Sequence, residues 1–408
     1  MGPVLRKPTS DDLPAIRSVD EFAFGTEFPD SVWNAWSDSF PLERSWVAEV
    51  DQEIIGLTAS HPFQISVPGR WVPAAGVTFV AVHPAHRRQG VLRSLMTRQL
   101  NELAAAGEPI ALLWASEPAI YGRYGFGSAA EHIDLTVPAD PAALPVIPGE
   151  ESLRVDTPTP LEARSAAVAV LQRVGALRPG VLSTEEQIWP LRVLDAPERR
   201  HGAGRLRAAV VSDNRGDPVA YALFAPKQKW DRGQADGEVA VREFAAVDAA
   251  ARSRLWRFLM SLDLMASLNW EDAPSDEPLQ LMTHASRQLI TGRRDSLWLR
   301  VLDVEAALLA RDYAGQLDLV FEIHDGLIAD CAGRWRLTNN AGTASCARTE
   351  APADLSLSVA ALGAAYLGGQ SFTRLADAGL VAEHTPGTLA AATVAFGSTR
   401  QPWCPFMF

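Results

Sequence analysis

The sequence predicts a mixed fold of helices and strands (α+β, with α/β mixed segments) divided into three domains. Strand and helix signals alternate over about the first 135 of its 408 residues. A stretch with six prolines then interrupts them at 137–160, and a last segment rich in strand signals begins near residue 300. At roughly 100–200 residues per domain, these breaks predict domains at 1–150, 151–297 and 298–408.

The prediction for the first segment rests on one buried strand and the helix that follows it. The apolar run 75–82 is typical of a strand buried on both faces, and Pro84 ends it because proline cannot donate to a ladder. Apolar residues then recur at helical spacing and predict an amphipathic helix over 91–106. Shorter strands, the first two paired as a hairpin, are expected at 45–50, 53–57 and 110–114.

The second segment repeats this order of elements. Its helices are expected at 161–174 and 249–268, and its strands at 219–225 and 239–244. No phosphate-binding loop is visible between residues 247 and 255, so we expect a structural copy of the first domain without its ligand site. In the third segment, strands are expected at 297–302, 317–323, 334–337 and 355–359, with helices at 304–310 and 390–396.

Composition excludes several classes of protein. The 37 basic and 49 acidic residues give a net charge of -12, which disfavours nucleic-acid binding and suits cationic ligands. Cys331, Cys346 and Cys404 have no CxxC spacing, and the eight histidines form no metal motif, so neither a disulfide framework nor a metal site is expected. With no apolar leader and no membrane span visible, we expect a cytoplasmic protein without membrane contacts.

The most informative segment is 79–93, where the buried strand passes through a basic loop into a helix. A helix start offers unsatisfied N–H groups and a positive dipole end, which together suit a pyrophosphate. Gly90 lets the backbone approach such a ligand closely, and Arg88 and Arg93 add positive charge. The alternative is an ordinary connection with a solvated basic loop.

These residues carry a resemblance to a known family. Arg87-Arg-Gln-Gly-Val-Leu92 resembles the R/Q-x-x-G-x-G/A signature of GNAT acetyltransferases, although Leu92 replaces the usual Gly or Ala. Together with the segment ASEPAIYGRYGFG at 115–127, it is similar to the Eis (enhanced intracellular survival) family of actinobacterial N-acetyltransferases. The resemblance implies a GNAT domain, a second GNAT-like domain, a sterol-carrier-protein-like domain (SCP2-like) and a homohexamer.

The resemblance also implies the site residues and acetyl-CoA as co-substrate. The cofactor contacts carried over are Val80, Ala81, Val82, Arg88, Gln89, Gly90, Val91, Leu92, Arg93, Ser116 and Glu117. Tyr121 matches the family's general acid, and the carboxylate of Phe408 matches its general base. The amine-substrate pocket is implied at Phe24, Trp36 and Phe79.

The chemistry of acetyl transfer fits these residue types. A protonated amine must lose a proton before it attacks, and a phenol can protonate the departing thiolate. The hypothesis is an N-acetyltransferase acting on primary amines, with aminoglycosides as acceptors; Glu27 is an acidic neighbour that suits their ammonium groups, whereas Met407 replaces an acidic residue of relatives. The alternatives are acetylation of protein lysines or polyamines, or a lipid-binding protein with vestigial GNAT domains, suggested by the Gly/Ala-rich stretch 360–369.

Overall fold

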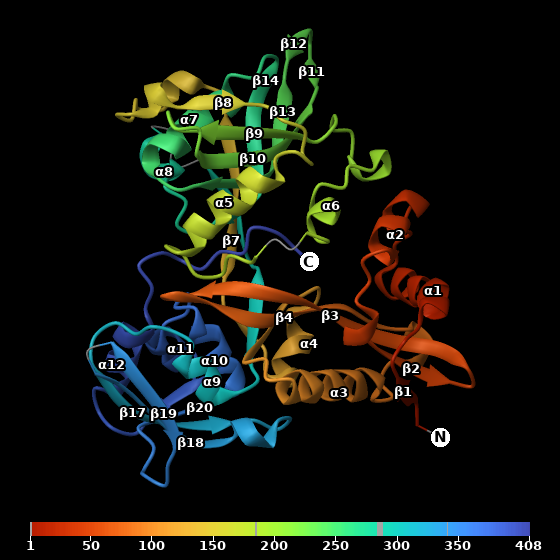
Figure 1. Cartoon of the computed structure of the whole chain (residues 1–408), viewed down its shortest axis with the longest axis vertical. Coiled ribbons are helices and arrows are strands. Elements are labelled where there is room, and N and C mark those ends of the chain that lie inside the picture. Colours follow the sequence, from red (N-terminus) through yellow and green to blue (C-terminus); the bar gives the residue numbers. More distant parts are fainter. Residues whose placement is uncertain (1, 184–185, 284–288, 341) are drawn as a thin grey trace. The chain divides into compact units, whose positions relative to one another are not determined.

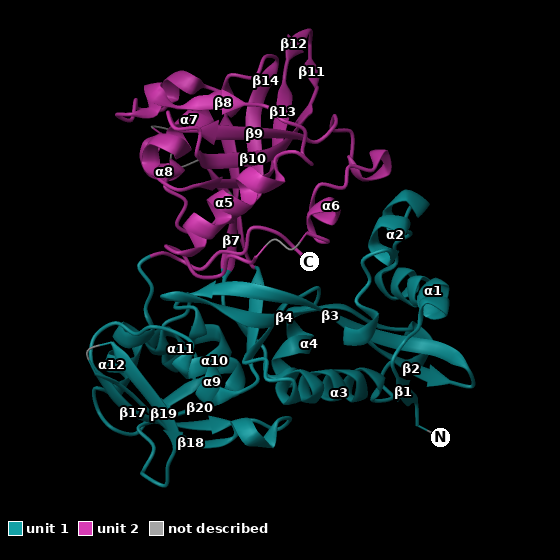
Figure 2. Cartoon of the chain, in the orientation of Figure 1, with its two compact units in different colours: residues 1–130, 296–399, 408 teal, residues 131–295, 400–407 magenta. Residues whose placement is uncertain are grey.

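A computed structural model of the chain describes residues 2–183, 186–283, 289–340 and 342–408. The chain forms two compact units (Figure 2). Unit 1 comprises residues 1–130, 296–399 and 408, and unit 2 comprises residues 131–295 and 400–407. The strand that was expected at 297–302 lies in unit 1, so the chain leaves its first unit and later returns to it.

The first sheet of unit 1 has seven strands in the order β1-β2-β3-β4-β5-β16-β6. Their bounds are β1 Val4–Arg6, β2 Trp46–Val50, β3 Glu53–Val67, β4 Arg70–Val82, β5 Ile110–Trp114, β16 Leu297–Val301 and β6 Gly127–Ser128. β4 and β5 run parallel, and the other neighbours run antiparallel. β3 and β4 extend well beyond the runs expected from the sequence and form one long hairpin.

Helices cover both faces of this sheet. On one face, α1 (Leu13–Phe24) and α2 (Asp30–Ser37) pack against a cluster that includes Ala81. On the other face, α3 (Val91–Ala105) packs against a cluster that includes Val82. Because successive residues of a strand point to opposite faces, Ala81 and Val82 place the helices on opposite sides, as Figure 1 shows. The helix expected at 91–106 is confirmed.

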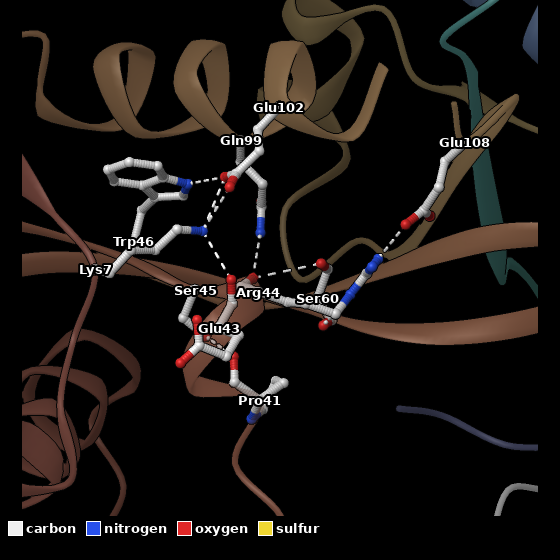
Figure 3. A network of polar contacts seen from close by, with 10 residues as sticks. All are labelled: Lys7, Pro41, Glu43, Arg44, Ser45, Trp46, Ser60, Gln99, Glu102 and Glu108. Carbon is white, nitrogen blue, oxygen red and sulfur yellow. Dashed lines mark hydrogen bonds and ion pairs between the residues drawn. The ribbon is translucent and has the colours of Figure 1, made fainter. Parts of the chain in front are cut away.

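A polar network fastens α3 to the edge of the sheet (Figure 3). The carboxylate of Glu102 on α3 accepts hydrogen bonds from Lys7, at 2.9 Å, and from the indole of Trp46. Arg44 forms an ion pair with Glu108 just beyond the helix, at 2.6 Å. These contacts tie the C-terminal end of α3 to β2 and to the residues just before it.

The rest of unit 1 is a five-stranded sheet in the order β19-β18-β17-β20-β21 with small helices. The strands are β17 Leu317–His324, β18 Gly333–Asn340, β19 Thr343–Arg348, β20 Leu355–Ser358 and β21 Val381–Glu383. The helices are α9 Val304–Leu309, α10 Val359–Tyr366, α11 Phe372–Asp377 and α12 Thr388–Phe396.

Helix α10 joins this part of unit 1 to the first sheet. A Cβ added to Gly127 would lie 1.9 Å from the carbonyl oxygen of Ala360, and one added to Gly363 would lie 2.2 Å from that of Leu299. The backbones therefore approach each other as only glycine allows. The Gly/Ala-rich composition of this stretch thus has a packing explanation.

Unit 2 is built on a second seven-stranded sheet, in the order β15-β7-β14-β13-β10-β9-β8. Its strands are β7 Glu131–Pro138, β8 Arg154–Asp156, β9 Arg207–Ser212, β10 Pro218–Lys227, β13 Gly237–Ala246, β14 Met265–Pro274 and β15 Ile290–Asp295. A small hairpin of β11 (Trp230–Asp231) and β12 (Gln234–Ala235) stands apart from the sheet. The helices are α5 Arg164–Gly175, α6 Trp189–Arg192, α7 Ala249–Met260 and α8 Leu279–Met282.

One expected element of unit 2 is wrong. The helix expected at 249–268 ends at Met260, and Met265 already begins β14, which pairs in parallel with β13. Leu264 adopts a left-handed φ of 66°, which turns the chain away from a helix. Met265, Ala266 and Leu268, which suggested a longer helix, instead belong to this partly buried strand.

Candidate active site

Strand β4 carries a bulge at the residues that the sequence marks as cofactor contacts. Leu57 pairs with Ala81 and Ala59 pairs with Thr78, so two residues of β4 lie opposite one residue of β3. Phe79, the first of the two, has a left-handed φ of 50°. A bulge disrupts the ladder locally and is a frequent device for aiming backbone groups at a site.

Before the bulge, β4 already loses its parallel neighbour. β4 and β5 pair only from Ala74–Ile110 to Gly76–Leu112, although β4 continues to Val82. Within the described residues, no strand pairs with that edge of β4 from Thr78 onward. The backbone groups of Val80, Ala81 and Val82 are therefore placed to bind an extended ligand arm by strand-like hydrogen bonds.

The loop after β4 leads to an open helix start. Arg88 and Gly90 have left-handed φ values of 62° and 83°, and no atom lies within 4 Å of a Cβ built on Gly90. Gly90 is the N-cap of α3, whose first internal bond runs from the Ser94 N–H to the Gly90 carbonyl at 3.0 Å. The N–H groups of residues 91–93 therefore point outward at the positive end of the helix dipole.

The side chains around this helix start differ in what they offer. Arg88, Gln89 and Arg93 are exposed, so the two guanidinium groups are available to an anionic ligand. Val91 is buried among the core residues of α3, and Leu92 packs beside it, so both residues offer only their backbone. The residues present therefore fit a pyrophosphate.

The corresponding helix of unit 2 is closed by its own cap. α7 follows β13 and precedes the parallel strand β14, the same order as β4, α3 and β5. Here the N-cap is Asp248, whose carboxylate accepts a hydrogen bond from the Ala251 N–H at 2.8 Å. The carboxylate lies where a phosphate would bind, and it already supplies the negative charge at that helix end. This explains in physical terms why unit 2 was expected to lack a ligand site.

Tyr121 is the last residue of the short helix α4 (Pro118–Tyr121), which follows β5 in the chain. Its side chain is 5% exposed, and this burial raises the pKa of the phenol, although a hydrogen bond with Ser116 opposes the shift. Ser116 itself and Glu117 are exposed. The phenol therefore stays protonated at neutral pH and can donate a proton or a hydrogen bond.

Phe408 lies on the face of the β3–β4 hairpin that α1 and α2 share. Its main-chain oxygen accepts a hydrogen bond from the Thr78 hydroxyl at 3.3 Å, and its ring lies 5.0 Å from that of Phe63. A Cβ on Gly76 would come within 2.8 Å of the Phe408 ring. The last residue of the chain is thus seated where β4 separates from β5.

An aromatic cluster adjoins the bulge. Trp36 meets Phe79 edge to face, with ring centroids 5.4 Å apart, and Phe28 lies 5.1 Å from Trp36. Phe24, the third residue expected to line the acceptor pocket, ends α1 with 48% of its surface exposed and is not part of this ring cluster. The structure therefore brings together two of the three.

Sequence reasoning missed two buried ionisable groups in this domain. His61 lies across the hairpin from Gly76, and burial together with the charge on Arg44 lowers the pKa of its imidazole to about 4. Asp20 is buried on α1, where burial and the charge on Glu21 raise the pKa of its carboxyl to about 7. No local pattern marks either residue, although the interruption of an apolar strand by Gly76 was a readable signal of close approach.

Comparison with known proteins follows this geometry. The family model of an acetyltransferase (GNAT) domain matches residues 4–129, and another GNAT domain model matches residues 180–301. A sterol carrier protein domain model matches residues 304–405. The expected fold class, two GNAT domains followed by a sterol-carrier-protein-like domain, is confirmed.

Relatives match over nearly the whole chain. The N-acetyltransferase Eis of Mycobacterium tuberculosis is 34% identical over 414 residues, which cover 98% of each protein. An uncharacterized N-acetyltransferase of Streptomyces coelicolor is 42% identical over 367 residues, 90% of this chain and 88% of that one. Eis1 of Mycobacterium abscessus has a similar structure, with a TM-score of 0.84 and 30% identity over 99% of this chain and all of that one.

No helix in the described part of the chain is long and apolar enough to cross a bilayer. None of the three cysteines forms a disulfide. Four observations point to the same family: the open start of α3, the bulge in β4 with the loss of its parallel neighbour, the order of the domains, and relatives that match nearly the whole chain. The chain is an acetyltransferase and belongs to the Eis family of GNAT N-acetyltransferases.

Proposed function

We propose that the protein transfers the acetyl group of acetyl-CoA directly to primary amines of small polycationic molecules, aminoglycosides among them, in a ternary complex. The observation that carries the proposal is the seat of Phe408 on Thr78, beside the point where β4 leaves β5. Phe408 carries a carboxylate, and its contact residue Thr78 belongs to the part of β4 without a strand neighbour, which suits the pantetheine arm.

The cofactor is expected to bind through backbone groups more than through side chains. The free edge at 80–82 is suited to the pantetheine arm, and the helix start at 88–93 is suited to the pyrophosphate. Ser116 and Glu117 lie at the end of β5, on the other side of the splay. Backbone N–H groups near the bulge are suited to polarising the thioester carbonyl.

Phe408 and Tyr121 supply the two proton transfers. The carboxylate of Phe408 takes a proton from the acceptor amine, directly or through water, and balances its positive charge as it attacks. An α-carboxylate has a pKa of about 3.3–3.7 in solution, so charge balance is a large part of this role. The phenol of Tyr121, kept protonated by burial, donates to the sulfur of coenzyme A as the thioester bond breaks. No covalent intermediate on the protein is needed.

The acceptor side is suited to cationic amines. Aromatic rings at Trp36 and Phe79 offer faces for the acceptor, and the exposed Glu27 offers a negative charge near the end of α1. Met407 is 69% exposed and supplies no charge next to Phe408. We therefore propose a narrower range of polycationic acceptors than an acidic residue at 407 would allow. From the family resemblance, we also propose that the protein assembles as a homohexamer.

The test is amine-dependent release of coenzyme A. The protein is incubated with acetyl-CoA and, in separate reactions, aminoglycosides, polyamines and lysine peptides, and the products are weighed by mass spectrometry. We expect release that depends on the amine and a mass gain of one or more acetyl groups on aminoglycosides. Turnover with lysine peptides or polyamines alone would reassign the acceptor. Acetyl-CoA binding without release by any amine would contradict the proposal.

A further inference from the structure

The tail that precedes Phe408 is held in unit 2 by contacts of three of its residues, Gln401, Trp403 and Phe406. Residues 400–407 belong to unit 2, whereas Phe408 belongs to unit 1 (Figure 2). Residues 402–406 are buried, although they form neither helix nor strand. A buried tail without secondary structure needs hydrogen-bond partners from other parts of the chain, and unit 2 holds this tail at three points.

The first anchor is an ion pair that brackets Gln401. Arg178, which is 5% exposed, donates from Nη1 to Asp276 Oδ1 and to the carbonyl oxygen of Gln401, both at 2.5 Å. The other carboxylate oxygen of Asp276 accepts the Gln401 N–H at 2.9 Å. The pair thus satisfies both backbone groups of one residue with charged partners, which make stronger hydrogen bonds than neutral ones.

The second anchor holds Trp403. Its N–H donates to the carbonyl of Pro179 at 2.9 Å, and its indole N–H donates to the carbonyl of Asp272 at 2.8 Å. The backbone of Gly180 lies so close that an added Cβ would be 2.8 Å from the Trp403 nitrogen, and Gly180 has a φ of 96°. The backbones of Gly180 and Trp403 therefore approach each other as only glycine allows.

The third anchor is the guanidinium of Arg192, which lies over the ring of Phe406 and is called the Arg192 platform below. The guanidinium carbon of Arg192 lies 3.8 Å from the centre of the Phe406 ring. Glu243 accepts hydrogen bonds from Arg192 at 2.5 and 3.1 Å, and the Tyr221 hydroxyl donates to the same carboxylate at 2.9 Å. The cation–π contact therefore forms with a guanidinium that its own partners hold still.

These anchors restrict the position of Phe408 through the chain itself. Two peptide units join Phe406 to Phe408, so their Cα atoms lie within about 7 Å of each other. We infer that the Arg178–Asp276 pair and the Arg192 platform are positioning residues, which hold the tail so that the Phe408 carboxylate meets the acceptor amine. This inference rests on the proposed function. It assigns Arg178, Asp276 and Arg192 to placing the terminal base through the tail that they hold.

The test is a double-mutant cycle. Arg178→Met and Asp276→Asn are each made in the full chain and again in a chain extended by one glycine after Phe408, which moves the carboxylate. Arg200→Met is the matched control, because Arg200 forms a two-point ion pair with Asp195 in unit 2 but does not touch the tail. Readouts are kcat, the KM for acetyl-CoA, and the rate at which a carboxypeptidase releases the last residues.

We expect each anchor variant to lower kcat about 10- to 100-fold, because a base displaced by roughly 1 Å loses its geometry, with an unchanged KM for acetyl-CoA. In the extended chain the same substitutions should cost nothing further, and carboxypeptidase should release residues faster from both anchor variants than from Arg200→Met. Equal losses in both backgrounds would overturn the inference in favour of a structural role. Wild-type protein without amine-dependent turnover would refute the proposed function itself.

Discussion

Thr78 and Phe408 are 330 positions apart in the chain, and the hydroxyl of Thr78 donates a hydrogen bond to the main-chain oxygen of Phe408 at 3.3 Å. Thr78 lies two residues beyond Gly76, where β4 and β5 stop pairing. The contact therefore joins the end of the chain to the part of the sheet that the cofactor is expected to approach.

Replacing Gly76 by Ala should displace Phe408. The added methyl would lie 2.4 Å from the Phe63 ring and 2.8 Å from the Phe408 ring, so both rings must shift. We expect kcat to fall at least about tenfold, while acetyl-CoA still binds. Gly237→Ala is the control, because Gly237 begins β13 in unit 2 and its added methyl would lie 2.5 Å from the Leu264 carbonyl oxygen and 2.8 Å from the Met265 side chain. Similar kcat losses in both variants would argue against a special role for the Phe408 seat.

Replacing Gly90 by Ala should weaken acetyl-CoA binding. The added methyl meets no atom, so the cost comes from the left-handed φ of 83°, which disfavours alanine by about 1–2 kcal/mol. If the helix start shifts to relieve this strain, its N–H groups leave the pyrophosphate, and we expect the Kd to rise roughly 5- to 30-fold in a titration by calorimetry. Gly107, at the other end of α3, has a φ of 81° and equally open surroundings. Gly107→Ala should therefore lose stability but keep its affinity; a matching loss of affinity would contradict the cofactor role of Gly90.

Tyr121→Phe should separate binding from turnover. The ring remains to fill its buried position, and only the hydroxyl, which we propose as the proton donor to the leaving sulfur, is lost. We expect kcat to fall by about 10²–10⁴, the usual contribution of a general acid, with an acetyl-CoA affinity within a factor of a few of the wild type. Stopped-flow measurement of thiol release after mixing gives the rate. Unchanged turnover would remove Tyr121 from the mechanism.

Asp20 should make stability depend on pH. Its folded pKa of about 7 lies above the ordinary value of 3.8, so between these values the unfolded chain releases the proton and the folded chain keeps it. The contribution of the protonated Asp20 carboxyl to the free energy of unfolding is therefore fully present below pH 3.8 and is lost as the pH rises to about 7. Above pH 7 the loss is on the order of 4 kcal/mol, at about 1.4 kcal/mol per pKa unit.

Asp20→Asn should remove that dependence. Urea unfolding at pH 8 should show the variant to be more stable than the wild type, and the difference should shrink as pH falls toward 4. The same difference at both pH values would show that the change alters packing rather than ionisation.

Some of this site could be predicted from the sequence because its signals are local. The apolar strand, the basic loop, Gly90 and the amphipathic helix follow one another within 79–106, and the structure arranges them as expected. The length of the helix expected at 249–268 was overestimated because its signal was also local. A short apolar run fits either a helix or a buried strand until strand pairing decides between them.

Other parts depend on contacts that no local pattern contains. The seat of Phe408 needs Thr78 and Phe63, and its anchors need Arg178 and Arg192, all far away in the chain. Only the resemblance to a family indicated that Phe408 takes part, and neither composition nor spacing indicated what holds it. The sequence analysis did not single out Asp248 as the cap of α7, because its consequence depends on the parallel strands on either side of the helix.

The most direct test of the central claim is to append one glycine after Phe408. Every side chain stays in the sequence, but the terminal carboxylate moves by one residue, so an amide replaces it at Phe408. We predict that coenzyme A release with an aminoglycoside acceptor falls by about 10² or more, while the Kd for acetyl-CoA stays the same. Turnover equal to that of the unextended chain would contradict the assignment of Phe408 as the base.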